Sequence, residues 1–265
     1  MNISLAAEPL FHIGSFPITN TLVVAWVLVA LLAVLGIVVG TRLREVPKGL
    51  QNVVEAVIEA LLRLVEGITQ DRAQAIKFFP LAATIFLFVL FSNLVEVLPG
   101  LGTIGLREMH EGKSIIVPFL RSASADLNFT LALAISAVVG VQIMGVATIG
   151  AAKYAGKFFV PPWKAPYGIG TFVGLLELVG EVAKIVSFSF RLFGNIFAGE
   201  VLLTVALVLV PYFVPLPFLF LELFVGFVQA LVFSTLTIVF LKMATEEHGG
   251  DMKPHPVVPH PCGQG

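Results

Sequence analysis

The sequence predicts an all-α integral membrane protein with about five transmembrane helices and one amphipathic surface helix. Of its 265 residues, 57% are hydrophobic and 12% are charged, whereas soluble domains carry roughly a quarter charged residues. The apolar residues form five long runs, and about 20 apolar helical residues span a hydrocarbon core of about 30 Å. Helices are expected because backbone groups in lipid must hydrogen-bond within their own segment.

We expect one membrane domain over residues 1–265, with an external tail at 1–18 and a cytoplasmic tail at 244–265. The predicted membrane helices cover residues 19–40, 78–98, 125–150, 169–210 and 218–243. The fourth run is too long for one perpendicular span, so it should be tilted, bent or partly outside the lipid.

An amphipathic helix is predicted over residues 48–75. Valine, leucine and isoleucine recur there at helical spacing, while Glu55, Glu59, Arg63 and Glu66 take the other face. This helix should lie along the cytoplasmic membrane surface or against a partner subunit.

The distribution of Lys and Arg sets the predicted orientation. With five spans, eleven of these residues fall in segments on one side and three on the other. Because basic loops stay in the cytoplasm, the N-terminus should be outside and the C-terminus cytoplasmic.

Other polar features indicate few further functions. The single cysteine, Cys262, excludes a Cys-based zinc site, and metal binding by His248, His255 and His260 in the Pro-containing tail is not expected. We expect no cofactor, and no basic run resembles a nucleic-acid-binding surface.

The fourth run contains an arginine, Arg191, near its middle, although an Arg at mid-membrane costs about 2.5–3.5 kcal/mol on insertion scales. A helical wheel places five polar residues within about 40° of one line, over about 27 Å. They are Glu177, Lys184, Ser187, Arg191 and Asn195. Glu177 and Glu181 should lie toward the cytoplasm. Glu200 should lie toward the outside, on the opposite face from Arg191.

The fifth run carries Glu222 and Gln229, seven residues apart and so on one face. In a helix antiparallel to the fourth, Glu222 should lie at the depth of Glu200, and Gln229 near the level of Arg191. Two carboxylates near one mouth of a channel could accept and pass protons.

Structural interpretations remain open for some of these groups. Glu177, Glu181 and Lys184 could form ordinary intramembrane ion pairs, and Asn93 and Glu96 could be an interfacial helix end. Asp126 opens the third run, where helix capping is the favoured interpretation. For the whole chain, a self-contained channel or secondary transporter and a membrane scaffold are the alternative classes, although no internal repeat supports a transporter.

Four segments carry a resemblance to a known family. They are SFSFRLFGNIFAGE at 187–200, FVQALVFSTLTIVFLKMATEEH at 227–248, FSNLVEVLPG at 91–100 and SADLNFTLALA at 124–134. Together they closely resemble subunit a of F-type ATP synthases.

The resemblance implies a proton-translocating stator in which the last two helices form a long tilted hairpin against a ring of c subunits. Two offset half-channels would carry protons to and from the ring. The implied partners are the c ring, b-type peripheral stalk subunits, the remainder of the synthase and the lipid bilayer. The expected location is a bacterial plasma membrane, with a plastid thylakoid membrane as the alternative. ATP formation is expected elsewhere, since the chain has no GxxxxGK[ST] loop.

The resemblance also implies roles for individual residues. Arg191 matches the essential arginine, Asn195 the motif asparagine, Glu200 the outer-channel acid, Gln229 the glutamine that supports the arginine, and Glu177 the acid of the cytoplasmic half-channel. Lys184 and Ser187 match polar motif positions. Glu222 departs from well-studied bacterial relatives, which carry histidine there, and Glu181 is also unusual. The pH dependence and the choice between protons and sodium stay open.

Overall fold

The computed structural model describes residues 9–13, 16–41, 49–97, 105–110, 113–118, 121–158, 169–210 and 213–245. In this part of the chain, five helices are long and apolar enough to cross a membrane. They are α1 (Asn20–Thr41), α3 (Arg72–Val97), α4 (Leu127–Ile149), α6 (Ile169–Leu209) and α7 (Pro215–Thr245). The predicted all-α membrane fold is confirmed.

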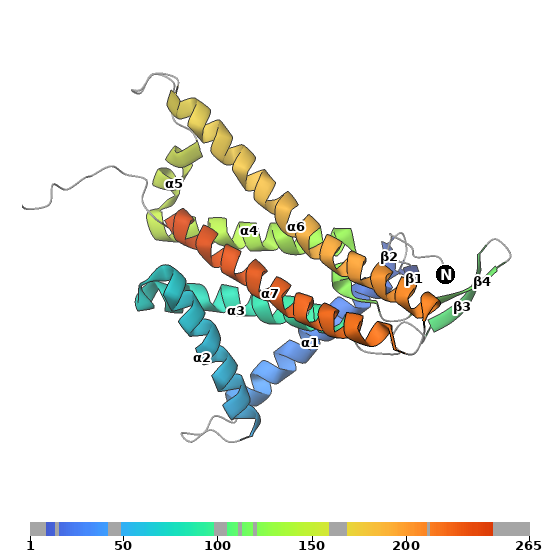
Figure 1. The fold of residues 1–265 in the computed structure, drawn as a ribbon. Coiled ribbons are helices and arrows are strands. Elements are labelled where there is room, and N and C mark those ends of the chain that lie inside the picture. Colours follow the sequence, from blue (N-terminus) through green and yellow to red (C-terminus); the bar gives the residue numbers. More distant parts are fainter. Residues whose placement is uncertain are drawn as a thin grey trace, which may run out of the picture.

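The amphipathic helix α2 (Leu50–Thr69) ends earlier than the predicted residue 75. Gln70 adopts the left-handed conformation, with φ of 57°, and its N–H donates to the Glu66 carbonyl oxygen at 2.8 Å. A left-handed residue at this position stops a helix. The chain then turns, and α3 starts at Arg72, before the predicted residue 78 (Figure 1).

Several short elements were not predicted. Strands β1 (Pro9–Ile13) and β2 (Phe16–Thr19) form a hairpin within the predicted external tail and its junction with α1, and β3 (Gly105–His110) and β4 (Lys113–Pro118) form a second. A short turn, η2 (Ala123–Ala125), precedes α4, and a short helix, α5 (Ala151–Phe158), follows it. Cys262, the three tail histidines and residues 246–265 of the predicted cytoplasmic tail lie outside the described residues.

The main core cluster lies where α3, α4, α6 and α7 meet, and Leu61 of α2 also belongs to it. The C-terminal part of α1 and the N-terminal part of α2 extend away from it (Figure 1). Phe188 of α6 is central: its ring centroid lies 4.5 Å from that of Phe233 and 5.6 Å from that of Phe240. Leu192, one turn later, is fully buried. These contacts fix the middle of α6 against α7.

One face of α6 is buried and the other is exposed. The buried residues Phe188, Ser189, Leu192 and Ile196 recur at helical spacing. Ser189 also reaches α4, where its hydroxyl lies 3.2 Å from that of Thr130. The packing therefore fixes the rotation of α6 about its axis and so decides which side chains point out of the chain.

Asp126 caps α4, as expected from the sequence. Its carboxylate accepts a hydrogen bond from the N–H of Asn128 at 2.9 Å, which satisfies one of the free donors at the start of the helix. The Thr21 hydroxyl donates to the other oxygen at 3.2 Å. This cap also fastens α1 to the start of α4.

Candidate functional site

Arg191 lies near the middle of α6, and its side chain is exposed on the outside of the chain. Its Nη2 donates a hydrogen bond to the Ser187 hydroxyl, one turn earlier, at 3.3 Å. Among the described residues, no carboxylate lies within ion-pair distance of this guanidinium. Its charge is therefore available to a group outside the chain.

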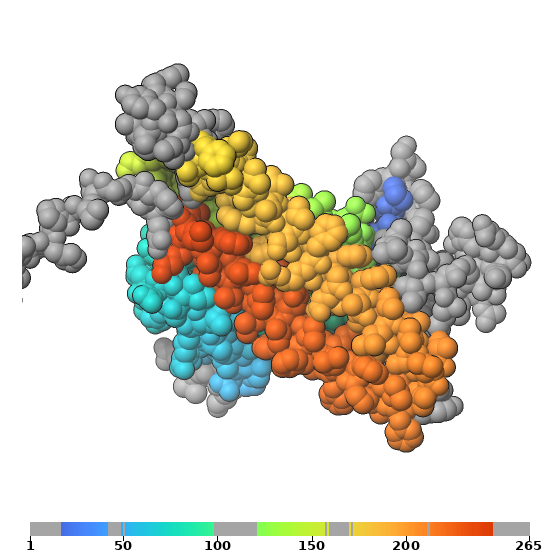
Figure 2. Space-filling view, turned by 45° about the horizontal axis from the view of Figure 1, so that its top comes forward, coloured from blue at the N-terminus to red at the C-terminus, as the bar shows by residue number. Residues whose placement is uncertain are grey.

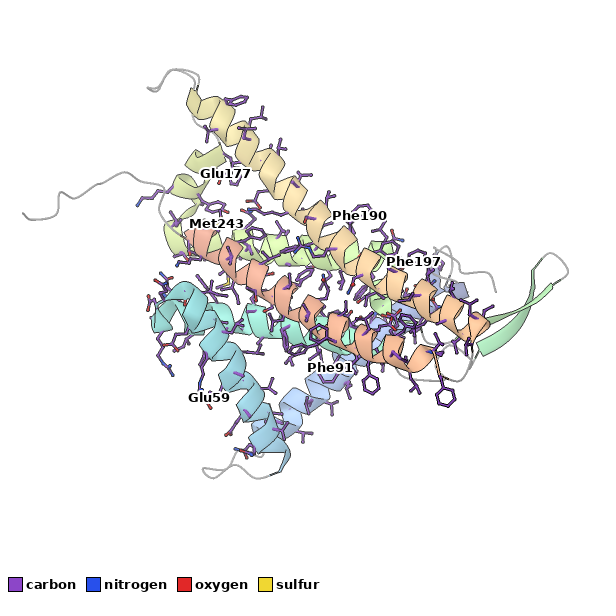
Figure 3. The ribbon with its side chains drawn as sticks, viewed as in Figure 1. Glu59, Phe91, Glu177, Phe190, Phe197 and Met243 are labelled. Atoms are coloured by element: carbon purple, nitrogen blue, oxygen red, sulfur yellow. The ribbon has the colours of Figure 1, made fainter. Side chains whose placement is uncertain are left out.

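Exposed apolar residues lie along both α6 and α7. Phe190, next to Arg191 in the chain, is 56% exposed and Phe224 on α7 is 62% exposed, and Leu202 and Phe220 are also exposed. Helices α6 and α7 cover the front of the molecule side by side in the space-filling view (Figure 2). Phe190 and Phe197 mark the middle of α6 in Figure 3. A fixed charge thus sits within an apolar surface formed by the last two helices.

The N-terminal half of α6 carries a second polar group. Lys184 Nζ lies 2.6 Å from Glu181 Oε1, and it also lies 4.6 Å from the centroid of the Phe240 ring on α7. Glu177 lies one turn earlier, toward the end of α6 that packs near α5 (Figure 3). The sequence-predicted stripe thus continues along this half of the helix.

Beyond Arg191, four charged residues from separate elements come together, and we call them the carboxylate cluster: Glu96 of α3, Arg121 before η2, Glu200 of α6 and Glu222 of α7. Arg121 Nη2 lies 2.8 Å from Glu200 Oε2, and the two side chains are 10% and 29% exposed. Glu200, which the wheel places opposite Arg191, thus faces Arg121.

Glu222 is 8% exposed, and both of its carboxylate oxygens are buried without a hydrogen-bond donor in the described part of the chain. The same holds for both oxygens of Glu96. The two carboxyl groups lie next to each other, about one turn beyond the contact between Asn93 of α3 and Gly226 of α7. Glu222 also packs on the backbone of Gly199, where a Cβ would collide with its Oε1.

A cavity of about 180 Å³ lies between α6 and α7, next to this cluster. Its polar lining comes from Asn195 and Glu222, and its other walls include Gly199, Leu202 and Phe218. The volume is large enough for several water molecules, which need polar partners of this kind. The cavity links the level of Asn195, one turn from Arg191, to Glu222.

Gln229 is 7% exposed and lies on the same helix as Glu222. Its Nε2 has no hydrogen-bond acceptor, and among the described residues the hydrogen bond of Arg191 goes to Ser187. The resemblance implies that Gln229 supports the arginine, but the described residues contain no hydrogen bond between the two side chains. No group of three or more His, Cys, Asp and Glu side chains suited to a metal occurs in the described ranges.

Sequence reasoning missed Arg121 and left Glu96 open between an interfacial role and a functional one. Arg121 was counted only as one of the basic residues of an outer loop, in the prediction of membrane orientation. The spacing of Asn93 and Glu96 puts both on one face of α3, and this was the available signal for Glu96.

The family model of the ATP synthase A chain matches residues 22–242, which include every one of these site residues. The chain belongs to the ATP synthase A chain family. The match includes all five membrane-spanning helices apart from a few terminal residues of α1 and α7.

Relatives within this family are similar over nearly their whole length. ATP synthase subunit a of Moorella thermoacetica is 33% identical over 240 residues, which are 90% of this chain and 96% of the relative. ATP synthase subunit a of Campylobacter jejuni is 36% identical over 241 residues, 89% of this chain and 88% of the relative. The Helicobacter pylori protein of the same name is 36% identical over 237 residues, 87% and 93% of the two chains.

Proposed function

We propose that this chain is the proton-translocating stator of an F-type ATP synthase and forms two offset half-channels against a ring of c subunits. The observation that carries the proposal is the exposed guanidinium of Arg191 within the apolar face of α6 and α7. A charge in lipid is costly, so a mobile carboxylate of a partner is the group that would offset this cost.

The polar groups on either side of Arg191 support two separate access routes. The carboxylate cluster and the cavity at Asn195 lie on one side. Glu177, Glu181 and Lys184 lie on the other, along the N-terminal half of α6. We assign the first route to the outside and the second to the cytoplasm, with the N-terminus outside, in a bacterial plasma membrane.

The fixed charge would convert proton flow into rotation. A ring carboxylate that approaches Arg191 is favoured in its ionised form, so it gives up its proton before it passes. The same charge repels a proton that would cross directly between the routes. One elementary charge driven across 100 mV supplies about 2.3 kcal/mol, so several protons are needed for each ATP made in the attached catalytic sector.

The test is Arg191→Ala in the complete synthase, with Arg63→Ala as the matched control. Arg63 lies on α2, 75% exposed in its side chain, and pairs with Glu59. We expect Arg191→Ala to abolish proton-driven ATP synthesis in membrane vesicles while the subunit still assembles, and Arg63→Ala to retain it. Coupled synthesis by Arg191→Ala would refute the proposal.

A self-contained channel or transporter is the alternative that the polar stripe alone would allow. Reconstitution of the purified chain separates the two, because the stator should give no steady proton flux without the ring. Co-purification should in turn recover a small two-helix proteolipid oligomer and b-type stalk subunits. Normal coupling after joint neutralisation of Arg191, Glu200 and Glu222 would instead favour a membrane scaffold.

A further inference from the structure

We propose that Glu96 and Glu222 share one proton and form the proton-exchanging pair of the outer route, while the ion pair with Arg121 holds Glu200 as a fixed, non-exchanging group. The inference rests on the proposed function and adds to it. It names Glu96 as a further proton-carrying residue and Arg121 as a positioning residue. It also excludes Glu200 from the residues that pass protons along the outer route.

The balance of charge within the carboxylate cluster is the first argument. Among the described residues, three carboxyl groups lie near the guanidinium of Arg121, and the charged groups that act on Glu96 are Glu222, Glu200 and Arg121. Arg121 is directly paired with Glu200 at 2.8 Å. Two neighbouring carboxylates without a cation of their own do not both stay ionised easily, so the Glu96–Glu222 pair holds a proton.

Hydrogen bonding gives an independent argument. Within the described ranges, all four carboxyl oxygens of Glu96 and Glu222 are buried and lack a donor, although a buried carboxylate needs hydrogen bonds. Both groups lie about one turn beyond the contact between Asn93 and Gly226, on antiparallel helices, so they face each other at the same level. One shared proton supplies the missing donor, so it satisfies two groups that are otherwise buried without a partner.

The position of Glu222 connects this pair to the route. Glu222 lines the cavity that also contains Asn195, whereas Glu200 does not line it. The pair would release its shared proton to water in the cavity and take a replacement from the outer side. Only O–H bonds are broken and formed, and the total charge of the pair returns to its starting value.

The first test measures ATP synthesis by the complete synthase in vesicles while the outer pH is varied, with the inner pH and the membrane potential held constant. In Glu96→Gln, the remaining Glu222 loses its like-charged neighbour and gains an amide donor. We expect a rate at least about tenfold lower, and a pH at half-maximal rate about one unit more acid, because coupled sites interact by about this much. Glu222→Gln should give the same shift.

The second test separates Glu200 from the relay. Arg121→Gln leaves a third uncompensated carboxylate beside the pair, so the pH at half-maximal rate should move the opposite way, to higher pH. The double variant Arg121→Gln/Glu200→Gln removes both charges of the ion pair and should regain at least half of the parent rate. Arg121→Lys should keep the parent pH profile more closely than Arg121→Gln.

Assembly is checked in every variant by the content of this subunit in the purified complex, and Glu222→Gln replaces Glu96→Gln if the latter does not assemble. A parent-like pH profile in the assembled variant of either residue would overturn the pair, as would loss of synthesis in the double variant. Arg191→Ala in the same vesicles separates the proposals. If Arg191→Ala abolishes synthesis while Glu96→Gln behaves like the parent, the proton-sharing pair is refuted and the proposed stator function is not.

Discussion

Asn93 donates a hydrogen bond from Nδ2 to the backbone carbonyl oxygen of Gly226, 3.1 Å away, and this bond joins α3 to α7. The two backbones come this close because residue 226 has no side chain. A Cβ there would lie 3.1 Å from the Cβ of Asn93, which is itself buried. The contact holds the helix that carries Glu222 and Gln229 against the helix that carries Glu96.

Gly226→Val should force α3 and α7 apart. Overpacking of a tight interface costs about 1–3 kcal/mol, so we expect a lower melting temperature of the purified complex and a lower rate of proton-driven synthesis. Gly36→Val is the matched control, because a Cβ at Gly36 meets nothing within 4 Å. Equal melting temperatures for the two variants would show that the contact contributes little.

Gly199→Ala should displace the carboxyl group of Glu222, since the new Cβ would collide with Oε1. The backbone of α6 tolerates alanine well, so the effect should appear in proton transfer and hardly in stability. We expect proton-driven synthesis to fall several-fold with unchanged subunit content, and Gly36→Ala to behave like the parent. An unchanged rate would mean that the position of Glu222 is unimportant.

Lys184→Met should destabilise the subunit by up to about 3 kcal/mol, because removal of one partner of a partly buried ion pair leaves the other charge uncompensated. Adding Glu181→Leu should restore the thermal stability of the complex. If Glu181 belongs to the cytoplasmic route, synthesis stays low in this double variant. Full recovery of synthesis would make the pair purely structural. The exposed pair on α2, changed to Glu59→Leu/Arg63→Met, should affect neither readout.

Tyr154 of α5 should make stability pH-dependent in alkaline solution. Burial, with a smaller contribution from Glu181 and Glu177, raises its pKa to about 12, whereas an unfolded tyrosine ionises near pH 10. The contribution is fully present below about pH 10 and is lost as the pH rises toward 12, because only the unfolded state then releases the proton. Melting temperatures across this range should fall less steeply in Tyr154→Phe. Parallel curves would contradict the assignment.

The membrane helices could be predicted from the sequence because their signal is local. Each long apolar run must satisfy its own backbone hydrogen bonds in lipid. The rotation of a helix about its axis also follows from spacing along that helix, so Arg191 and Ser187 could be placed on one line. The end of α2 at Gln70 could not be predicted from the sequence, since glutamine has no special preference for the left-handed conformation that it adopts there.

The partner of Glu222 could not be predicted either. Depth along antiparallel helices suggested Glu200, but depth does not fix which faces of two helices meet. The packing of α3 against α7 brings Glu96 to Glu222, while a segment before η2 brings Arg121 to Glu200. Both relationships join residues far apart in the sequence, and a helical wheel describes one helix at a time.

The outward direction of Arg191 has a consequence for the chain before it assembles with a partner. An orphan copy would present a bare cation to acyl chains, an arrangement that is expensive in a membrane. Completion of the surrounding complex would remove this penalty. A copy of the chain without its complex should therefore be less stable in the membrane than an assembled copy.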